Sequence, residues 1–148
     1  MKKICILLII VFAILSVNGI SYSNEQQINK YCNNANAFIQ KGEYQKALKE
    51  LEKALHVCIK MFTQDHLNTA IICKNIALVC NAMGKYEDAL EYFLKAYDVF
   101  SRTPGDSDPG TIEVIYNIGT IYDCIGKYDE ALKFLNKAYN LRKLKLTQ

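Results

Sequence analysis

The sequence predicts an all-α fold, a solenoid of three helix-turn-helix units with six helices. The first observation behind this prediction is a glycine phrase repeated at intervals of 42 residues: residues 42–48, 84–90 and 126–132 each read Gly-x-Tyr-x-x-Ala-Leu. The second is that apolar residues recur at steps of three and four on both sides of each glycine, which is the spacing of one helix face. A fixed period of this length is typical of stacked repeats that share one core.

An export signal is expected before the first unit. The chain starts with the basic Met1-Lys2-Lys3, continues with an uncharged apolar run over residues 4–15, and then becomes small and polar. This is the organisation of a secretory signal peptide. Small residues fit cleavage after Gly19 or after Ser23, and the second is favoured because the repeats begin just beyond it.

The chain is therefore expected to comprise a signal peptide, residues 1–23, and a repeat domain, residues 24–148, that is exported to the periplasm or secreted. The alternative is an uncleaved anchor over residues 4–20, whose length is at the lower limit for spanning a bilayer. Contact with a membrane is expected only in that alternative.

Charge gives no support for nucleic-acid binding. The formal net charge of +3 falls by two, to +1, without Lys2 and Lys3. The lysines of the second helices alternate with Glu and Asp, as on an ordinary solvated helix face. A nearly neutral domain of this kind lacks the basic surface that nucleic-acid binding requires.

The three units are expected over approximately residues 24–65, 66–107 and 108–148, each with one helix on either side of its glycine. That glycine suits a left-handed helix end. Residues 101–107, with Pro104-Gly105, are the one obvious loop. Small residues recur where two helices must approach closely: Ala35, Ala77 and Gly119 in the first helices, and Ala47, Ala89 and Ala131 in the second.

These residues resemble the tetratricopeptide repeat, whose pattern has a large residue, Leu-Gly, Tyr and a later Ala-x-x-x-Phe. The third unit shows the pattern most fully, with Ile115, Ile118-Gly119, Tyr122 and Ala131-x-x-x-Leu135. The first unit departs from it at Asn34, where an apolar residue is expected, which indicates looser packing or a role as a cap.

The period of 42 exceeds the common tetratricopeptide length of 34 residues and also fits HEAT and armadillo repeats. The glycine phrase favours the tetratricopeptide family, and the longer unit resembles the variant found in kinesin light chains. The resemblance implies a right-handed α-solenoid in which each helix is longer by about one turn of 3.6 residues.

The resemblance also implies a concave groove, lined by the first helices, that holds a peptide or a partner protein. Three asparagines, Asn33, Asn75 and Asn117, recur there at intervals of 42 residues. An amide both donates and accepts hydrogen bonds, so this column can pair with the backbone of an extended peptide. Alternatively, the asparagines tie one helix to its neighbour or are merely tolerated on a polar face. The other groove candidates are Asn36, Lys74, Leu78, Asn81, Glu113, Tyr116, Thr120 and Asp123.

A carboxylate clamp for C-terminal peptides, which some members of that family possess, is not expected here. Asn36 and Asn75 match the asparagines of the clamp, but Cys32, Glu113 and Asn117 stand at its basic positions. A chaperone tail is therefore not expected as a ligand of this groove.

No catalytic or cofactor site is expected. The two histidines, His56 and His66, fall in different contexts, and no Cys-x-x-Cys pair suggests a metal. Cys73 and Cys80 lie on the buried stripe and are expected to act as small core residues. Cys32 and Cys124 fall on the groove side and are the better candidates for a reactive thiol.

The sequence thus predicts a non-catalytic adaptor or scaffold that binds a peptide or protein in its concave face. The alternative is an assembly module that self-associates, or docks on a partner, through its C-terminal helix. Stacked repeats need polar terminal caps, whereas the last helix carries Leu132, Leu135 and Tyr139 with no later helix to cover them.

Overall fold

The computed structural model describes residues 22–146, and within that range the regular structure is entirely helical. The predicted signal peptide lies outside the described residues apart from its last two positions, which belong to the first helix. The helices are the first helix (residues 22–40), α2 (Tyr44–Met61), α3 (Leu67–Ala82), α4 (Tyr86–Phe100), α5 (Pro109–Cys124) and α6 (Tyr128–Leu146).

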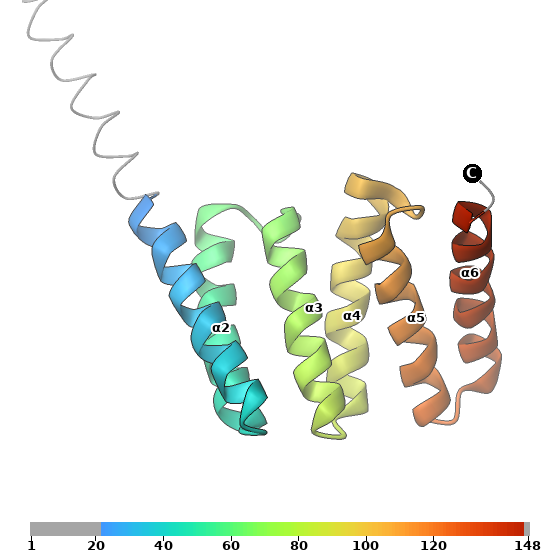
Figure 1. Ribbon diagram of the computed structural model, residues 1–148, viewed down its shortest axis with the longest axis horizontal. Coiled ribbons are helices and arrows are strands. Elements are labelled where there is room, and N and C mark those ends of the chain that lie inside the picture. Colours follow the sequence, from blue (N-terminus) through green and yellow to red (C-terminus); the bar gives the residue numbers. More distant parts are fainter. Residues whose placement is uncertain (1–21, 147–148) are drawn as a thin grey trace, which may run out of the picture.

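The helices stand side by side in chain order, as three antiparallel pairs (Figure 1). Each of the helices from α2 to α6 packs on its neighbour in the sequence. This is the six-helix solenoid that the 42-residue period predicts. The first helix, α3 and α5 are the first members of their pairs, and α2, α4 and α6 are the second members.

The three repeated glycines end the first helices in the same way. Gly42, Gly84 and Gly126 have φ angles of 71°, 73° and 76°. After each of them, the next backbone N–H bonds the carbonyl five residues earlier at 2.9 Å, as Glu43 does to Phe38. Because L side chains disfavour this left-handed conformation, glycine at the position after the helix is what keeps the three turns alike.

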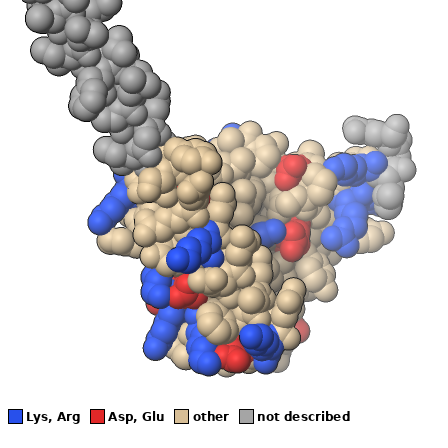
Figure 2. All heavy atoms as spheres, turned by 60° about the vertical axis from the view of Figure 1, so that its left-hand side comes forward, with Lys and Arg blue, Asp and Glu red and all other residues tan. Residues whose placement is uncertain are grey.

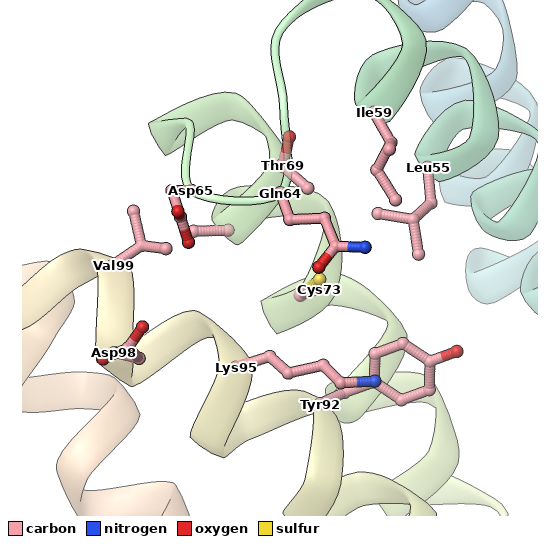
Figure 3. A pocket seen from close by; sticks show the side chains of 11 residues that line it. Leu55, Ile59, Gln64, Asp65, Thr69, Cys73, Tyr92, Lys95, Asp98 and Val99 are labelled. Carbon is pink, nitrogen blue, oxygen red and sulfur yellow. The ribbon is translucent and has the colours of Figure 1, made fainter.

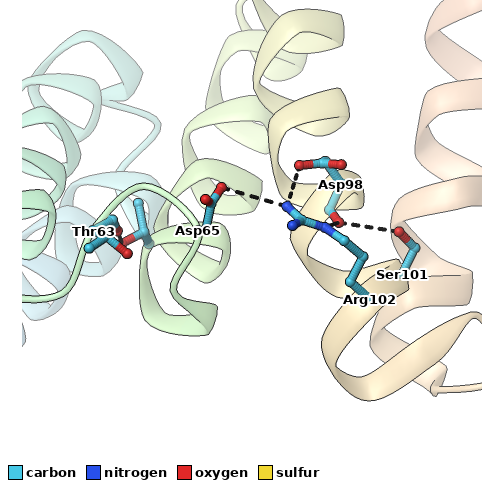
Figure 4. Close-up of polar contacts among 6 residues, drawn as sticks. Thr63, Asp65, Asp98, Ser101 and Arg102 are labelled. Carbon is cyan, nitrogen blue, oxygen red and sulfur yellow. Dashed lines mark hydrogen bonds and ion pairs between the residues drawn. The ribbon is translucent and has the colours of Figure 1, made fainter.

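The prediction of a loop over residues 101–107 is wrong for residues 101–105. Residues Ser101–Gly105 form a π-helical turn, η1, that continues α4. Arg102 stabilises the turn because its Nε donates to the Asp98 carbonyl at 2.8 Å and its guanidinium pairs with the Asp98 carboxylate at 2.5 Å. Asp65, in the preceding connection, lies 3.6 Å from the same guanidinium (Figure 4).

The core forms where small residues let the helices approach. Ala35, Ala77, Ala47 and Ala89 are fully buried, as their repeated positions predict. At Gly119, a Cβ atom would lie 2.8 Å from the Leu135 side chain, so α5 and α6 require glycine at this crossing.

The outer side of the first helix is polar, which explains the departure at Asn34. In α3 and α5 the equivalent places, facing the preceding pair, hold buried side chains: Thr69, Ile72, Ile76 and Val79, and Thr111, Val114, Ile118 and Ile121. The first helix instead exposes Gln27, Lys30, Asn34 and Ala37. The Asn34 amide donates to Glu50 of α2 at 3.1 Å. The structure therefore favours the cap over loose packing.

Candidate functional site

The first-helix face, defined by Asn33, Asn75 and Asn117, is the predicted binding surface. Asn33 is exposed, and Asn75 and Asn117 are half-buried. Asn117 donates to the Glu113 carbonyl of its own helix at 3.0 Å. Within the described residues, the side chains of Asn33 and Asn75 make no hydrogen bond, so the column does not tie the helices together.

The remaining predicted residues also lie on the first helices of their pairs. Asn36, Tyr116 and Asp123 are exposed, and Lys74, Leu78, Asn81 and Thr120 are half-buried. Lys74 reaches across to α5, where its Nζ lies 3.2 Å from a carboxylate oxygen of Glu113. The single basic group among the candidates is thus already paired, and the face carries amides and apolar groups together with the exposed carboxylate of Asp123.

An open cleft of about 380 Å³ separates the first helix from α3. The cleft lies about one helical turn closer to the N-termini of these two helices than Asn33 and Asn75 do. The sequence analysis did not predict this cleft. A signal was present, because the partly exposed Ile71 is apolar, whereas its equivalents one period before and after it, Asn29 and Glu113, are polar. The lining residues of the cleft are Glu25, Ile28, Asn29, Cys32, Phe62, Asn68, Ile71 and Ile72.

The five cysteines from Cys32 onward are free thiols. Cys73 and Cys80 are buried, as predicted for core residues, and so is Cys58. Burial, together with the nearby Cys58, raises the pKa of Cys32, which makes its thiolate scarce at neutral pH. The prediction of a reactive thiol is therefore not supported at Cys32, whereas Cys124 is exposed.

A second pocket, of about 250 Å³, opens between α2 and α4 at the start of α3, and no sequence prediction named it (Figure 3). Leu55 and Ile59 of α2 form one wall and Val99 of α4 another, with Ala70 and Cys73 of α3 beneath them. The polar members of its lining are Gln64, Asp65, Thr69, Tyr92, Lys95 and Asp98.

Three ion pairs fix the polar rim of this pocket. The Lys95 ammonium lies 2.6 Å from a Glu91 carboxylate oxygen and 5.0 Å from the centre of the Tyr92 ring. Arg102 holds Asp98 and Asp65 on the other side. Burial raises the pKa of Cys73 to about 11, so this thiol is neutral and belongs to the apolar floor.

The outer face of α6 carries an apolar stripe. Tyr128, Leu132 and Tyr139 are exposed over 69%, 61% and 64% of their surface. The half-buried Leu135 lies between them along the helix and also packs against Gly119 of α5. One period earlier, α5 packs on α4, where Phe93, the counterpart of Leu135, is fully buried. Among the described residues, no helix takes that place on α6.

The described residues contain no cluster of His, Cys, Asp and Glu suited to a metal ion. None of the helices between residues 22 and 146 combines the length and hydrophobicity needed to cross a bilayer. On the face shown in Figure 2, Lys and Arg at the lower left lie among Asp and Glu. Charge on that face is therefore mixed in sign.

Comparison with protein families matches the chain to a model described as "Tetratricopeptide repeat", over residues 26–97 and 73–143. A comparison with curated proteins finds no match. Among solved structures, the TPR domain of Arabidopsis FLU is similar with a TM-score of 0.72 and 19% identity, covering 82% of this chain and 98% of that one.

Two further structures that are similar to this chain belong to longer proteins. BtubC (BKLC) from P. vanneervenii has a TM-score of 0.74 and 24% identity, covering 78% of this chain and 46% of its own. A putative kinesin light chain from Podosopora anserina, with nearly identical TPR-like repeats, has a TM-score of 0.70 and 18% identity, covering 78% and 55%. The chain thus spans about half the length of these two structures.

Proposed function

The chain belongs to the tetratricopeptide repeat family, and we propose that it is a non-catalytic protein-binding module whose first-helix face holds an extended segment of a partner. The observation that carries this proposal is the asparagine column. Asn33 and Asn75 keep their amides unbonded on a surface that also offers Leu78 and Tyr116. Amides at a constant spacing suit a peptide backbone, which repeats its donors and acceptors whatever its sequence.

The cleft between the first helix and α3 extends this surface. Ile71, at its edge, is partly exposed, and Ile28 lies in its lining. An apolar side chain of the bound segment would enter here, while its backbone pairs with the amides beyond. Affinity then rests on backbone contacts and selectivity on the cleft.

A peptide-display selection against the purified protein, followed by affinity measurements on the selected peptides, tests this proposal. The double change Asn75→Ala and Asn117→Ala should weaken binding at least tenfold without changing the helix content. Asn140→Ala, on the exposed side of α6, is the matched control and should bind as the unchanged protein does. Equal affinities for all three proteins would refute the amide column.

A second function, assembly through α6, is favoured by the apolar stripe Tyr128, Leu132, Leu135 and Tyr139. We propose that a second copy covers it, α6 against α6. Stacking of one copy's first helix on this stripe is disfavoured, because the first helix presents Gln27, Lys30 and Asn34 on the side that would have to make the contact.

Charge supports an antiparallel pair of α6 helices. The helix starts with the acidic Asp129 and Glu130 and carries basic residues, including Arg142, in its last turns. The alignment that sets Leu132 opposite Tyr139 of the second copy also sets Asp129 opposite its Arg142. The stripe follows steps of four, three and four residues, which is the spacing of a coiled-coil seam.

Molar mass by light scattering tests the assembly. We expect a dimer that Leu132→Glu converts into a monomer, while Leu94→Glu, at a partly exposed leucine of α4, leaves the dimer intact. Arg142→Glu should weaken the dimer, and the added change Asp129→Arg should restore it. A monomer at high concentration, or a dimer that Leu132→Glu does not affect, would rule out this interface.

The domain division and the export of the protein are also proposals. Residues 1–23 have the composition of a signal peptide. We expect the protein isolated from its native cells to start at Asn24 and to occur in the periplasm or the medium. Intact mass measurement distinguishes this from a chain that retains residues 4–20 as an anchor.

A further inference from the structure

The pocket between α2 and α4 has a counterpart, one period later, that carries an aromatic ring. We call the packing of α2, α3 and α4 the first junction and the packing of α4, α5 and α6 the second junction. A shift of 42 residues relates every lining residue of the pocket to one in the second junction. Four of the replacements are larger: Tyr97 stands for Leu55, Ile112 for Ala70, Ile115 for Cys73 and Leu141 for Val99. Ser101, in the place of Ile59, is smaller.

In the second junction, the Tyr97 ring stands where Leu55 stands in the first, and an opening of about 430 Å³ lined by Tyr97, Lys133, Phe134 and Lys137 remains beside it. The Tyr97 ring lies edge-on to Phe134, with ring centres 6.4 Å apart. Its hydroxyl lies 2.5 Å from the Lys137 ammonium, which donates to it, and itself donates to Asp106 at 3.3 Å. Lys137 also pairs with Asp106 at 2.8 Å, so this ring is held at its edge and at its oxygen.

In the first junction, the groups that would hold such a ring are present and the ring is not. Tyr92 takes the place of Phe134, Lys95 that of Lys137, and Gln64 that of Asp106. Leu55, in the place of Tyr97, is shorter than a tyrosine, and the pocket lies beside it. Figure 3 shows Leu55, Tyr92 and Lys95 around the open space.

We infer that this pocket binds a para-substituted phenol, with the ring against Tyr92 and the phenol oxygen toward Lys95. An ammonium has three donor hydrogens, so Lys95 can keep Glu91 and still donate to a ligand. The volume of about 250 Å³ is below that of pockets for drug-sized ligands and suits a single ring. The site goes beyond the proposed peptide surface, because it opens between the second helices of the pairs rather than on the first-helix face.

The phenol could be a free small molecule or the side chain of a tyrosine in a partner, and two probes distinguish these sources. We would titrate the isotope-labelled protein with 4-methylphenol and, separately, with N-acetyltyrosinamide, and follow amide NMR shifts. Saturable shifts at Thr69, Cys73 and Lys95 with both probes indicate a tyrosine side chain as ligand. Shifts with 4-methylphenol alone indicate a free phenol. The absence of saturable shifts with either probe would overturn the inference.

Variants show whether the pocket itself is responsible. Leu55→Tyr supplies the ring from within and should abolish the saturable shifts. Lys95→Met keeps the length of the side chain but removes the donor, and should weaken 4-methylphenol binding at least fivefold while leaving binding of toluene, which has no oxygen, unchanged. Lys49→Met, at an exposed lysine of α2, is the control.

The reverse change provides a test that does not depend on the first junction. The triple change Tyr97→Leu, Ile112→Ala and Ile115→Cys should open the second junction and create a second phenol site, with new shifts at Thr111 and Lys137. Circular dichroism checks that each variant keeps its helices. If Leu55→Tyr and Lys95→Met both bind 4-methylphenol as the unchanged protein does, the pocket is not the site.

Discussion

The two junctions of this solenoid follow one 42-residue plan, but the second carries a tyrosine ring where the first carries a leucine beside a pocket. In the second, Tyr97 and Lys137 connect α4, α6 and Asp106 of the intervening connection. In the first, Leu55 and Cys73 are smaller than their counterparts and Lys95 pairs within its own helix. This difference shows that, in a repeat protein, a few side chains determine whether a given place between the helices is a packed core or a pocket.

The connections before α3 and α5 differ in a related way. Thr63 has a φ angle of 120°, whereas its counterpart Gly105 has 88°, and only glycine adopts such angles easily. A hydrogen bond holds Thr63 in this conformation, because the Thr69 hydroxyl donates to the Thr63 carbonyl at 2.7 Å. The first junction thus combines a pocket with a strained connection beside it.

The largest expected effect is the difference in stability lost when equivalent side chains of the two junctions are truncated to alanine. Tyr97→Ala should lower the free energy of unfolding by about 3 kcal/mol, because the ring packs on Phe134 and bonds Lys137. Leu55→Ala, at the same place one period earlier, should cost only about 1 kcal/mol, because one side of Leu55 already faces the pocket. Urea denaturation measures both changes, and equal losses would contradict the difference between the junctions.

Filling the pocket should have a smaller effect of the opposite sign. The double change Ala70→Ile and Cys73→Ile copies the second junction and should raise the free energy of unfolding by about 1 to 2 kcal/mol. Ile115→Cys should lower it by about 1 to 2 kcal/mol, because that change leaves a cavity at a fully buried position. Thermal denaturation provides the check, and a lower midpoint for the double variant would mean that overpacking outweighs filling.

The strained connection predicts a gain from glycine. Thr63→Gly should stabilise the protein by about 1 kcal/mol, since relief of the positive φ angle outweighs the added freedom of the unfolded chain. Gly105→Ala should destabilise by about 1 kcal/mol at the equivalent position. Loss of stability on Thr63→Gly would show that the threonine side chain is needed at this place.

The smallest expected effect is a pH dependence of the second junction. Burial by itself lowers the pKa of Lys137, but the bonds to Asp106 and Tyr97 outweigh it, so the pKa is raised. A raised pKa in the folded state stabilises the protein below the unfolded pKa, and that stability disappears as pH rises through the folded value.

Lys137→Met should therefore cost about 0.5 to 1 kcal/mol at neutral pH, and the cost should vanish in strongly alkaline solution. Lys95→Met should cost less, because its partner Glu91 is exposed and lies on the same helix. Denaturation of the three proteins at neutral and alkaline pH measures this, and a cost for Lys137→Met that does not change with pH would contradict it.

The sequence was sufficient for the fold because a few local rules recur in register. Gly42, Gly84 and Gly126 mark the helix ends, and Ala35 and Ala77 mark the close crossings. These are properties of single positions repeated three times, so the period alone reveals them. The residues of the predicted peptide surface also lie on the first helices of their pairs.

The pocket could not be predicted in the same way, because it requires three smaller residues on two helices, α2 and α3, to meet. Cys73 alone looked like a small core residue, and it is buried. Only with Leu55 and Ala70 beside it does the missing volume become a pocket. Comparing each unit with the next, position by position, would have suggested it. The π-helical turn η1 was missed for a similar reason, since Arg102 stabilises it through Asp98, a residue of the preceding helix.

Hydroxyl-radical footprinting of the protein, alone and bound to a selected peptide, tests the central claim that the first-helix face is the binding surface. The account predicts that Leu78 and Tyr116 become protected from oxidation on binding, while Leu132 and Tyr139 of α6 keep the reactivity that they have in the peptide-free protein. Unchanged reactivity of Leu78 and Tyr116, with protection confined to α6 or to the pocket between α2 and α4, would contradict it.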